Sequence, residues 1–189
     1  MRDAVLLLAG GASRRLPGKL ERELGGKAMI LRVAENLRGG GRAMYVAAGG
    51  SFAPETDAAL DAPLIVDRAR FAGPLRALLD ASTRIPADRI FAVAADQPHL
   101  EASVLDALTD AWRPGDEAAV PQHSGGIEPL AALYDRAALL RVGALCKRDG
   151  RAAMRDLLAL LAVRFVSLES RYFTNVNTSD DLRRVTQTA

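Results

Sequence analysis

The N-terminal residues combine an apolar run, a pair of glycines and a group of cations within a short span. Val5 to Leu8 is long enough for a buried strand and too short for most helices. Ala9-Gly10-Gly11 follows, where the missing side chains let the backbone bend tightly and approach a ligand closely. The next polar residues are Ser13, Arg14, Arg15 and Lys19. Exposed amides beside a hydroxyl and fixed cations favour an anion, so the pattern predicts a polyphosphate site.

Two common phosphate-binding loops are excluded by the spacing. A Walker loop needs Gly, four residues and then Gly-Lys-Ser/Thr. Gly18-Lys19 has Ser13 at the position of the first glycine, and Leu20 follows. A dinucleotide fingerprint needs Gly-x-Gly-x-x-Gly, which the residues after Gly10-Gly11 do not supply. The loop therefore binds phosphate by a third design; the alternative is a plain strand-to-helix turn with solvated arginines.

Two aspartates follow apolar runs that read as buried strands. Asp96 comes directly after residues 90–95, and the carboxyl ends of strands are where open α/β sheets bind ligands. Mg²⁺ needs only one or two protein carboxylates when phosphates and water supply the rest, so Asp96 is a candidate metal ligand. The alternative is a cap for the helix that follows. Asp67, after residues 64–66, is a candidate acceptor for a base or ribose, or an ion-pair partner of Arg68 and Arg70.

Further candidates are weaker when taken alone. Gly73-Pro74 predicts a helix start with an open backbone where a flat base can approach, or only an ordinary helix start. Asn175 and Asn177 place two amides on one face of an extended segment, either to bind a polar substrate or to shape a turn. His99 and His123 are interpreted as structural or solvated. A substrate phosphate is already ionised at neutral pH and needs no histidine base, so the reaction can rely on positioning, Mg²⁺ and cations.

Taken together, these segments resemble a known family. Residues 8–16, Leu-Ala-Gly-Gly-Ala-Ser-Arg-Arg-Leu, with Lys19 beyond them, are similar to the signature of the MobA-like nucleotidyltransferases. The later segments occur in the family's order: Ile65-Val66-Asp67, Gly73-Pro74-Leu75, Asp96-Gln97-Pro98 and Asn175-Val176-Asn177-Thr178. Each segment is weak alone, but together they span nearly the whole chain.

The resemblance implies a role for each matching residue. Nucleotide binding is expected at Leu8, Ala9, Gly10, Gly11, Ser13, Arg14, Lys19, Asp67, Gly73, Pro74 and Asp96. Lys19, Arg15 and Asp96 are the expected catalytic residues, with Asp96 holding Mg²⁺ and either Lys19 or Arg15 stabilising the departing pyrophosphate. Asn175 and Asn177 are expected to face the acceptor.

The guanylyltransferase branch of the family transfers GMP from GTP to molybdopterin, and the resemblance implies that activity here. It also implies GTP, molybdopterin or molybdenum cofactor, and other proteins of molybdenum cofactor biosynthesis as partners. Gln97 is equally typical of the cytidylyltransferase relatives, so transfer of CMP, or of another nucleotide to a different phosphate acceptor, stays open. A binding module that retains the nucleotide pocket without catalysis is the alternative from another class.

The composition is that of a soluble, globular protein. The 189 residues suit one domain, 1–189, with 49% hydrophobic and 25% charged residues. A formal net charge of +2 is too small for a general nucleic-acid binder. Cys146 is the only cysteine and is expected to be buried packing, which excludes an intrachain disulfide. No leader pattern and no apolar run approaching ~18 residues is visible, so we expect a cytoplasmic protein without a membrane span.

Apolar runs alternate with helical patterns, which predicts an α/β sheet domain. The expected strands are 3–8, 43–48, 63–66, 89–95, 117–121, 129–134 and 163–168. Between 120 and 134 two strands are joined by a loop over 122–128 without a helix, which predicts an antiparallel strand. Ser179 is expected to cap a last helix. The fold class is a Rossmann-like three-layer sandwich with a mostly parallel sheet and an antiparallel strand.

Overall fold

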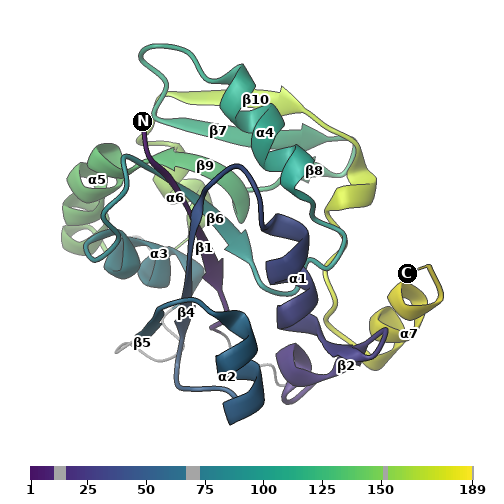
Figure 1. Ribbon diagram of the computed structural model, residues 1–189. Coiled ribbons are helices and arrows are strands. Elements are labelled where there is room, and N and C mark those ends of the chain that lie inside the picture. The colour runs from purple at the N-terminus through teal and green to yellow at the C-terminus, as the bar shows by residue number, and fades with distance from the viewer. Residues whose placement is uncertain (11–15, 67–72, 151–152, 189) are drawn as a thin grey trace.

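A mixed β-sheet forms the centre of the structure, a computed structural model that describes residues 1–10, 16–66, 73–150 and 153–188. The strand order is β10-β7-β9-β6-β1-β4-β5, and the short β8 pairs with β7 (Figure 1). The strands are β1 (Asp3–Leu8), β4 (Ala43–Ala48), β5 (Leu64–Val66), β6 (Arg89–Ala94), β7 (Ala118–His123), β8 (Gly126–Ile127), β9 (Ala131–Asp135) and β10 (Val163–Ser167).

The sheet is parallel except around β9 and β8. β1 pairs in parallel with β4 and β6, β4 with β5, and β7 with β10, whereas β9 runs antiparallel to both β6 and β7. The antiparallel strand predicted after residue 120 is therefore confirmed. The expected loop over 122–128 is wrong in part, because β7 continues to His123 and turns tightly into β8, with Gln122 opposite Ile127.

Helices cover both faces of the sheet, which confirms the expected three layers. One face carries α3 (Pro74–Ser82), α5 (Arg136–Arg148) and α6 (Met154–Leu158). The other carries α1 (Met29–Leu37), α2 (Pro54–Leu60) and α4 (Ala102–Ala111). A hairpin of β2 (Glu23–Leu24) and β3 (Lys27–Ala28) precedes α1, and α7 (Ser179–Thr188) lies beside β2 (Figure 1). Short 3₁₀ helices occupy Lys19–Glu21 and Ser170–Tyr172.

The central strands are apolar on both faces because helices bury both sides. Along β1, Leu6 and Leu8 pack on the α3–α5 side, whereas Val5 and Leu7 pack on the α1–α4 side.

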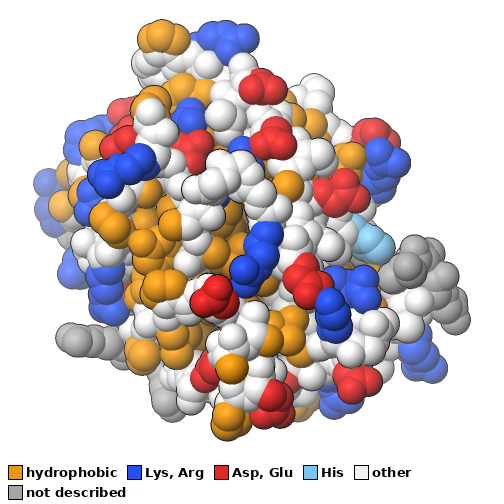
Figure 2. All heavy atoms as spheres, viewed as in Figure 1, with side chains coloured by type: hydrophobic (Ala, Val, Ile, Leu, Met, Phe, Trp, Pro, Cys, Tyr) orange, Lys and Arg blue, Asp and Glu red, His pale blue; other side chains and the backbone are white. Residues whose placement is uncertain are grey.

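Cys146 is buried on α5, as the sequence predicted. In the described part of the chain, no helix has both the length and the apolar character that crossing a membrane requires. Charged side chains of both signs are intermixed on the face shown in Figure 2.

A buried ion pair joins the amino ends of β1 and β6. Arg89 and Asp3 lie opposite each other in the sheet, and the Arg89 Nε and Nη2 atoms donate to the two Asp3 carboxylate oxygens at 2.8 and 2.7 Å. Their side chains are 7% and 11% exposed. The Arg89 guanidinium also lies 5.1 Å from the centre of the Trp112 ring. The pair therefore fixes the register of the two central strands at the edge opposite their carboxyl ends.

Removing one partner should be costly because the other charge stays buried. We predict that Arg89→Ala lowers the free energy of unfolding by about 3 kcal/mol in urea denaturation. Arg183→Ala is the control, because Arg183 and its partner Asp180 are 73% and 66% exposed and such pairs contribute less than about 1 kcal/mol. Equal effects of the two changes would contradict the structural role given to Arg89.

Candidate active site

Ala9 and Gly10 follow β1 at the carboxyl edge of the sheet. The Ala9 N–H donates to the Ala47 carbonyl oxygen at 2.8 Å, and the Ala95 N–H donates to the Leu8 carbonyl oxygen at 3.2 Å. These bonds hold the chain after β1 between the ends of β4 and β6. Leu8, Ala9 and Asp96 are thus brought to one edge, as predicted from the strand pattern.

Gly10 lies at this edge of the sheet. It is exposed, and a Cβ placed on it would meet none of the atoms that the structure describes within 4 Å. The predicted close approach of a nucleotide to this backbone stays a prediction.

Lys19 is presented by a tight turn. Gly18 has φ +65° and ψ 20°, a left-handed conformation that glycine adopts without strain, and the 3₁₀ helix Lys19–Glu21 starts directly after it. The Lys19 N–H donates to the Leu16 carbonyl oxygen at 3.2 Å, and Leu16 is buried. An apolar anchor and a left-handed glycine therefore fix the base of the lysine side chain.

The Lys19 ammonium contacts three oxygen atoms from two distant segments. It forms an ion pair with Asp96 Oδ2 and donates to the Val176 carbonyl oxygen and Asn177 Oδ1, both at 3.3 Å. The Lys19 and Asp96 side chains are 14% and 18% exposed. An ammonium has three donors and no acceptor, so these partners match its capacity. The Lys19 ammonium therefore contacts the side chains of two other predicted site residues, Asp96 and Asn177.

The backbone ties the same segments together. The Val176 N–H donates to the Asp96 carbonyl oxygen at 2.9 Å. Val176 is fully buried in a small apolar cluster, whereas Asn175 is exposed and Asn177 is half-buried. The alternation predicted for Asn175 and Asn177 thus holds, and the apolar residue between them is what anchors the segment.

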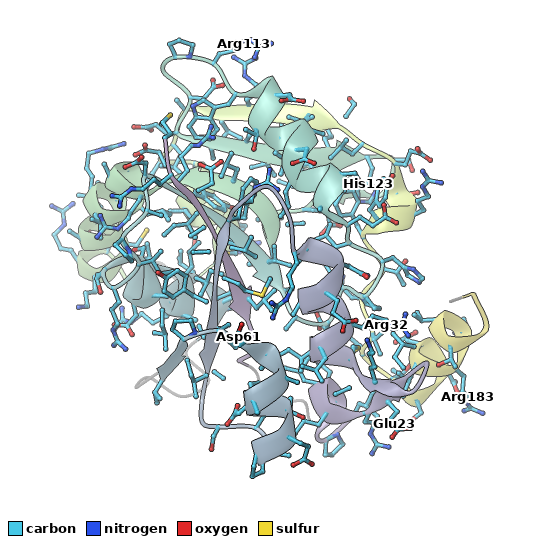
Figure 3. All side chains as sticks on the ribbon, in the orientation of Figure 1. Glu23, Arg32, Asp61, Arg113, His123 and Arg183 are labelled. Atoms are coloured by element: carbon cyan, nitrogen blue, oxygen red, sulfur yellow. The ribbon has the colours of Figure 1, made fainter. Side chains whose placement is uncertain are left out.

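That apolar cluster joins both ends of the chain beside the site. Its buried members are Leu16, Leu24, Met29, Val176 and Val185, with Leu20 and Leu182 packed against them. Arg32, labelled in Figure 3, holds the β2–β3 turn by donating to the Leu24 and Gly25 carbonyl oxygens at 3.0 and 3.2 Å. The hairpin that the sequence analysis did not predict therefore supports the segment that carries Lys19.

The helix after Asn177 begins with a reciprocal cap. Thr178 Oγ1 accepts from the Asp181 N–H at 3.1 Å, and Asp181 Oδ2 accepts from the N–H groups of Thr178 and Asn177 at 2.9 and 3.0 Å. The expectation that Ser179 is the cap is wrong by one residue, because Ser179 is the first residue of α7. The Thr178 hydroxyl and then the Asn177 N–H lower the pKa of Asp181. The cap fixes the backbone on which Asn177 stands.

The predicted site segment Gly73-Pro74 forms the start of α3. Gly73 has φ +90° and ψ 165°, and Pro74 is the first helical residue, which confirms the predicted helix start. Pro74 is exposed and Gly73 is half-buried, so the helix start is open to solvent. Among the described residues, the hydrogen bonds of the Lys19 ammonium go to Asp96, Val176 and Asn177 and not to Gly73 or Pro74.

Several predicted residues have no described position. Gly11, Ser13, Arg14, Arg15 and Asp67 lie outside the described residues. Their roles stay predictions, including the choice between Lys19 and Arg15 as the residue that stabilises pyrophosphate.

His123 has a structural role, one of the two interpretations given for it. Its side chain is 10% exposed and it stacks on Phe173. No sequence pattern indicates this contact, because the two residues lie on separate segments that the fold brings together.

Asp96 is the candidate ligand for a metal ion at this site. Among the described residues, no group of three or more His, Cys, Asp and Glu side chains gathers in a way that could hold a metal. Asp96 is a single carboxylate at a strand end, and Mg²⁺ characteristically uses one or two carboxylates with substrate phosphates and water. A single carboxylate at this position fits the Mg²⁺ ligand expected from the sequence.

Comparison with known proteins decides the family. The MobA-like NTP transferase domain matches residues 5–165, which includes the β1 segment, Asp96 and the antiparallel β9. The chain belongs to the MobA-like NTP transferase family. It is a nucleotidyltransferase, and the edge built around Lys19 and Asp96 is its candidate active site.

Individual relatives agree with this assignment. The MobA-like chain is 30% identical to the molybdenum cofactor guanylyltransferase of Desulfosudis oleivorans, over 96% of this chain and 94% of that protein. Its fold matches the molybdopterin-guanine dinucleotide biosynthesis protein A of Archaeoglobus fulgidus with a TM-score of 0.77 and 26% identity, over 100% and 98% of the two chains. A CMP:2-keto-3-deoxy-manno-octonic acid synthetase complexed with CTP has a TM-score of 0.77 at 18% identity, covering 100% and 98%, and shares the fold.

The cap of α7 should make the stability of the protein depend on pH. Because the native pKa of Asp181 is lowered, its contribution to stability is full above the unfolded pKa of about 3.9 and is lost as the pH falls through the native value. Asp181→Asn should therefore lower Tm at pH 7 and have a shrinking effect below about pH 4. Asp180→Asn, on the same helical turn but 66% exposed, is the control. A constant Tm difference from pH 7 down to pH 2.5 would contradict the capping role.

Proposed function

We propose that this transferase moves GMP from GTP to the terminal phosphate of molybdopterin and releases pyrophosphate. A phosphate oxygen of the acceptor forms a bond to the α-phosphorus of GTP. The bond from that phosphorus to the α–β bridging oxygen breaks, and its electron pair leaves with pyrophosphate. The attacking oxygen is already ionised, so no protein base has to remove a proton. Catalysis then depends on alignment and charge stabilisation.

The single observation that supports the proposal is the shared contact of Lys19 with Asp96 and Asn177. Lys19 comes from the segment after β1 that we assign to phosphate binding. Asp96 comes from the end of β6, and Asn177 from the segment that we assign to the acceptor. A transferase must place a nucleotide and an acceptor within reach of one cationic group. The described residues place all three segments around one ammonium.

Lys19 is the residue assigned to the triphosphate. Its partners are one carboxylate and two neutral oxygens, which hold the ammonium at the edge of the sheet. A cation fixed in advance stabilises negative charge that develops on the departing pyrophosphate without further reorganisation. Arg14 and Arg15 are proposed to bind the same phosphates.

Asp96 is the residue assigned to Mg²⁺. The ion would polarise the phosphate oxygens and offset the charge of the triphosphate. The Asp96 carboxylate is about four-fifths buried and its backbone carbonyl oxygen is bonded to Val176, so the side chain is held at a defined position at the edge. With Mg²⁺ bound, the Asp96 carboxylate would be balanced by the ion as well as by the Lys19 ammonium.

The nucleotide and the acceptor are assigned to opposite sides of Lys19. The exposed Gly10 and the exposed helix start at Gly73-Pro74 are proposed to receive the base, together with Asp67. Asn175, exposed beside the buried Val176, and Asn177 are proposed to bind the pterin side of molybdopterin. Both amides can donate and accept, which suits a polar heterocycle.

Pyrophosphate release with a panel of nucleotides tests the proposal. Wild-type protein is incubated with molybdopterin, Mg²⁺ and either GTP, CTP or ATP, and pyrophosphate is measured. We expect GTP to react at least about tenfold faster than CTP or ATP, equivalent to ~1.4 kcal/mol. Reactions without molybdopterin and with excess chelator are the controls, and both should release little pyrophosphate.

Each other outcome points elsewhere. A preference for CTP would assign the chain to cytidylyl transfer, in line with Gln97, which is buried next to Asp96 and whose Oε1 has no hydrogen-bond partner among the described residues. Release with GTP but only with a different phosphate acceptor would contradict molybdopterin as the substrate. Tight GTP binding without release under any condition would favour a non-catalytic nucleotide-binding or carrier module.

A further inference from the structure

A stacked pair of rings joins the β7–β8 hairpin to the segment that leads into Asn175. The His123 and Phe173 ring centroids are 5.1 Å apart and their planes differ by 10°. His123 is the last residue of β7, and Figure 3 shows it where the hairpin meets the chain that follows β10. The His123 side chain is 10% exposed and Phe173 is 7% exposed. The stack is therefore nearly dry and holds two segments together.

Hydrogen bonds fix the plane of the His123 ring. The Gly125 N–H donates to His123 Nδ1 at 3.0 Å, so this nitrogen is the acceptor. His123 Nε2 then carries the hydrogen and donates to Glu128 Oε1 at 3.0 Å. The Glu128 N–H in turn donates to the Pro121 carbonyl oxygen at 3.0 Å. With both nitrogens engaged, the ring face is held toward Phe173.

Phe173 is one of two buried anchors around an exposed pair of residues. Thr174 and Asn175 are exposed, while Phe173 and Val176 on either side are buried. Val176 is held by the hydrogen bond from its N–H to the Asp96 carbonyl oxygen. Phe173 is held by the His123 stack and by an edge-on contact with Tyr172, whose ring centroid lies 6.3 Å from that of Phe173. A short exposed segment between two fixed ends has few conformations available, so its side chains are presented in a defined way.

We propose that His123 is a positioning residue for the acceptor: through Phe173 it fixes the segment that presents Asn175. This inference rests on the proposed function and adds a residue to it. His123 touches no reacting atom, so its loss should weaken acceptor binding and leave the chemical step and the nucleotide site unchanged. Lys19, Asp96 and Val176 keep the far end of the segment in place.

Steady-state kinetics with two variants of one residue test the proposal. His123→Ala removes the ring, and we expect KM for molybdopterin to rise about fivefold, the size that loss of one ring stack carries. The kcat and the KM for GTP should stay within about twofold of wild type. His123→Phe is the matched control, because it keeps a ring against Phe173 and should restore the KM for molybdopterin to within about twofold.

The outcomes separate this inference from the function on which it rests. If wild type releases no pyrophosphate with any nucleotide, the proposed function fails. If wild type is active and His123→Ala leaves the KM for molybdopterin unchanged, or changes kcat and both KM values together, the positioning role is overturned. If His123→Ala does not fold, Phe173→Leu, which keeps an apolar side chain but loses the ring face, decides by the same pattern of KM values.

Discussion

The ion pair between Lys19 and Asp96 is the contact around which this site is arranged. The two residues are 77 positions apart, and the ammonium also reaches oxygen atoms of Val176 and Asn177. Because both side chains are mostly shielded from water, their attraction is stronger than that of an exposed pair, and leaving either charge alone would be unfavourable. The segment that carries Lys19, the end of β6 and the segment around Asn177 therefore have to meet at one point.

Several other elements of the fold hold Lys19, Asp96 and Asn177 in position. The sheet brings the ends of β1, β4 and β6 together through buried strands, so Asp96 leaves a fixed edge. The small cluster around Leu16 and Val176 holds the two partners of the ion pair from outside the main core. The Thr178–Asp181 cap and the His123–Phe173 stack then fix the chain on both sides of Asn175 and Asn177. The site is thus preorganised by packing on several independent elements.

The sheet could be predicted from the sequence because each strand carries its own signal. Runs such as Val5 to Leu8 and Ile90 to Ala95 are apolar on both faces, and β1 and β4 lie at the predicted residues. The hairpin of β2 and β3 could not be predicted, since strands of two residues show no periodicity. The family segments predict a set of site residues, and the structure brings three of them, Lys19, Asp96 and Asn177, into contact. These segments could not predict that Lys19 pairs with Asp96 or that His123 stacks on Phe173, because such contacts depend on how distant segments are packed.

A double-mutant cycle on Lys19 and Asp96 tests the central claim most directly. Pyrophosphate release with GTP and molybdopterin is measured for wild type, Lys19→Ala, Asp96→Ala and the double variant. If the two residues act as one unit, each single change should lower kcat by about 10²-fold or more, and the double variant should be no worse than the more damaged single variant by more than about threefold. Losses that multiply to about 10⁴-fold in the double variant would show independent roles and would contradict the account.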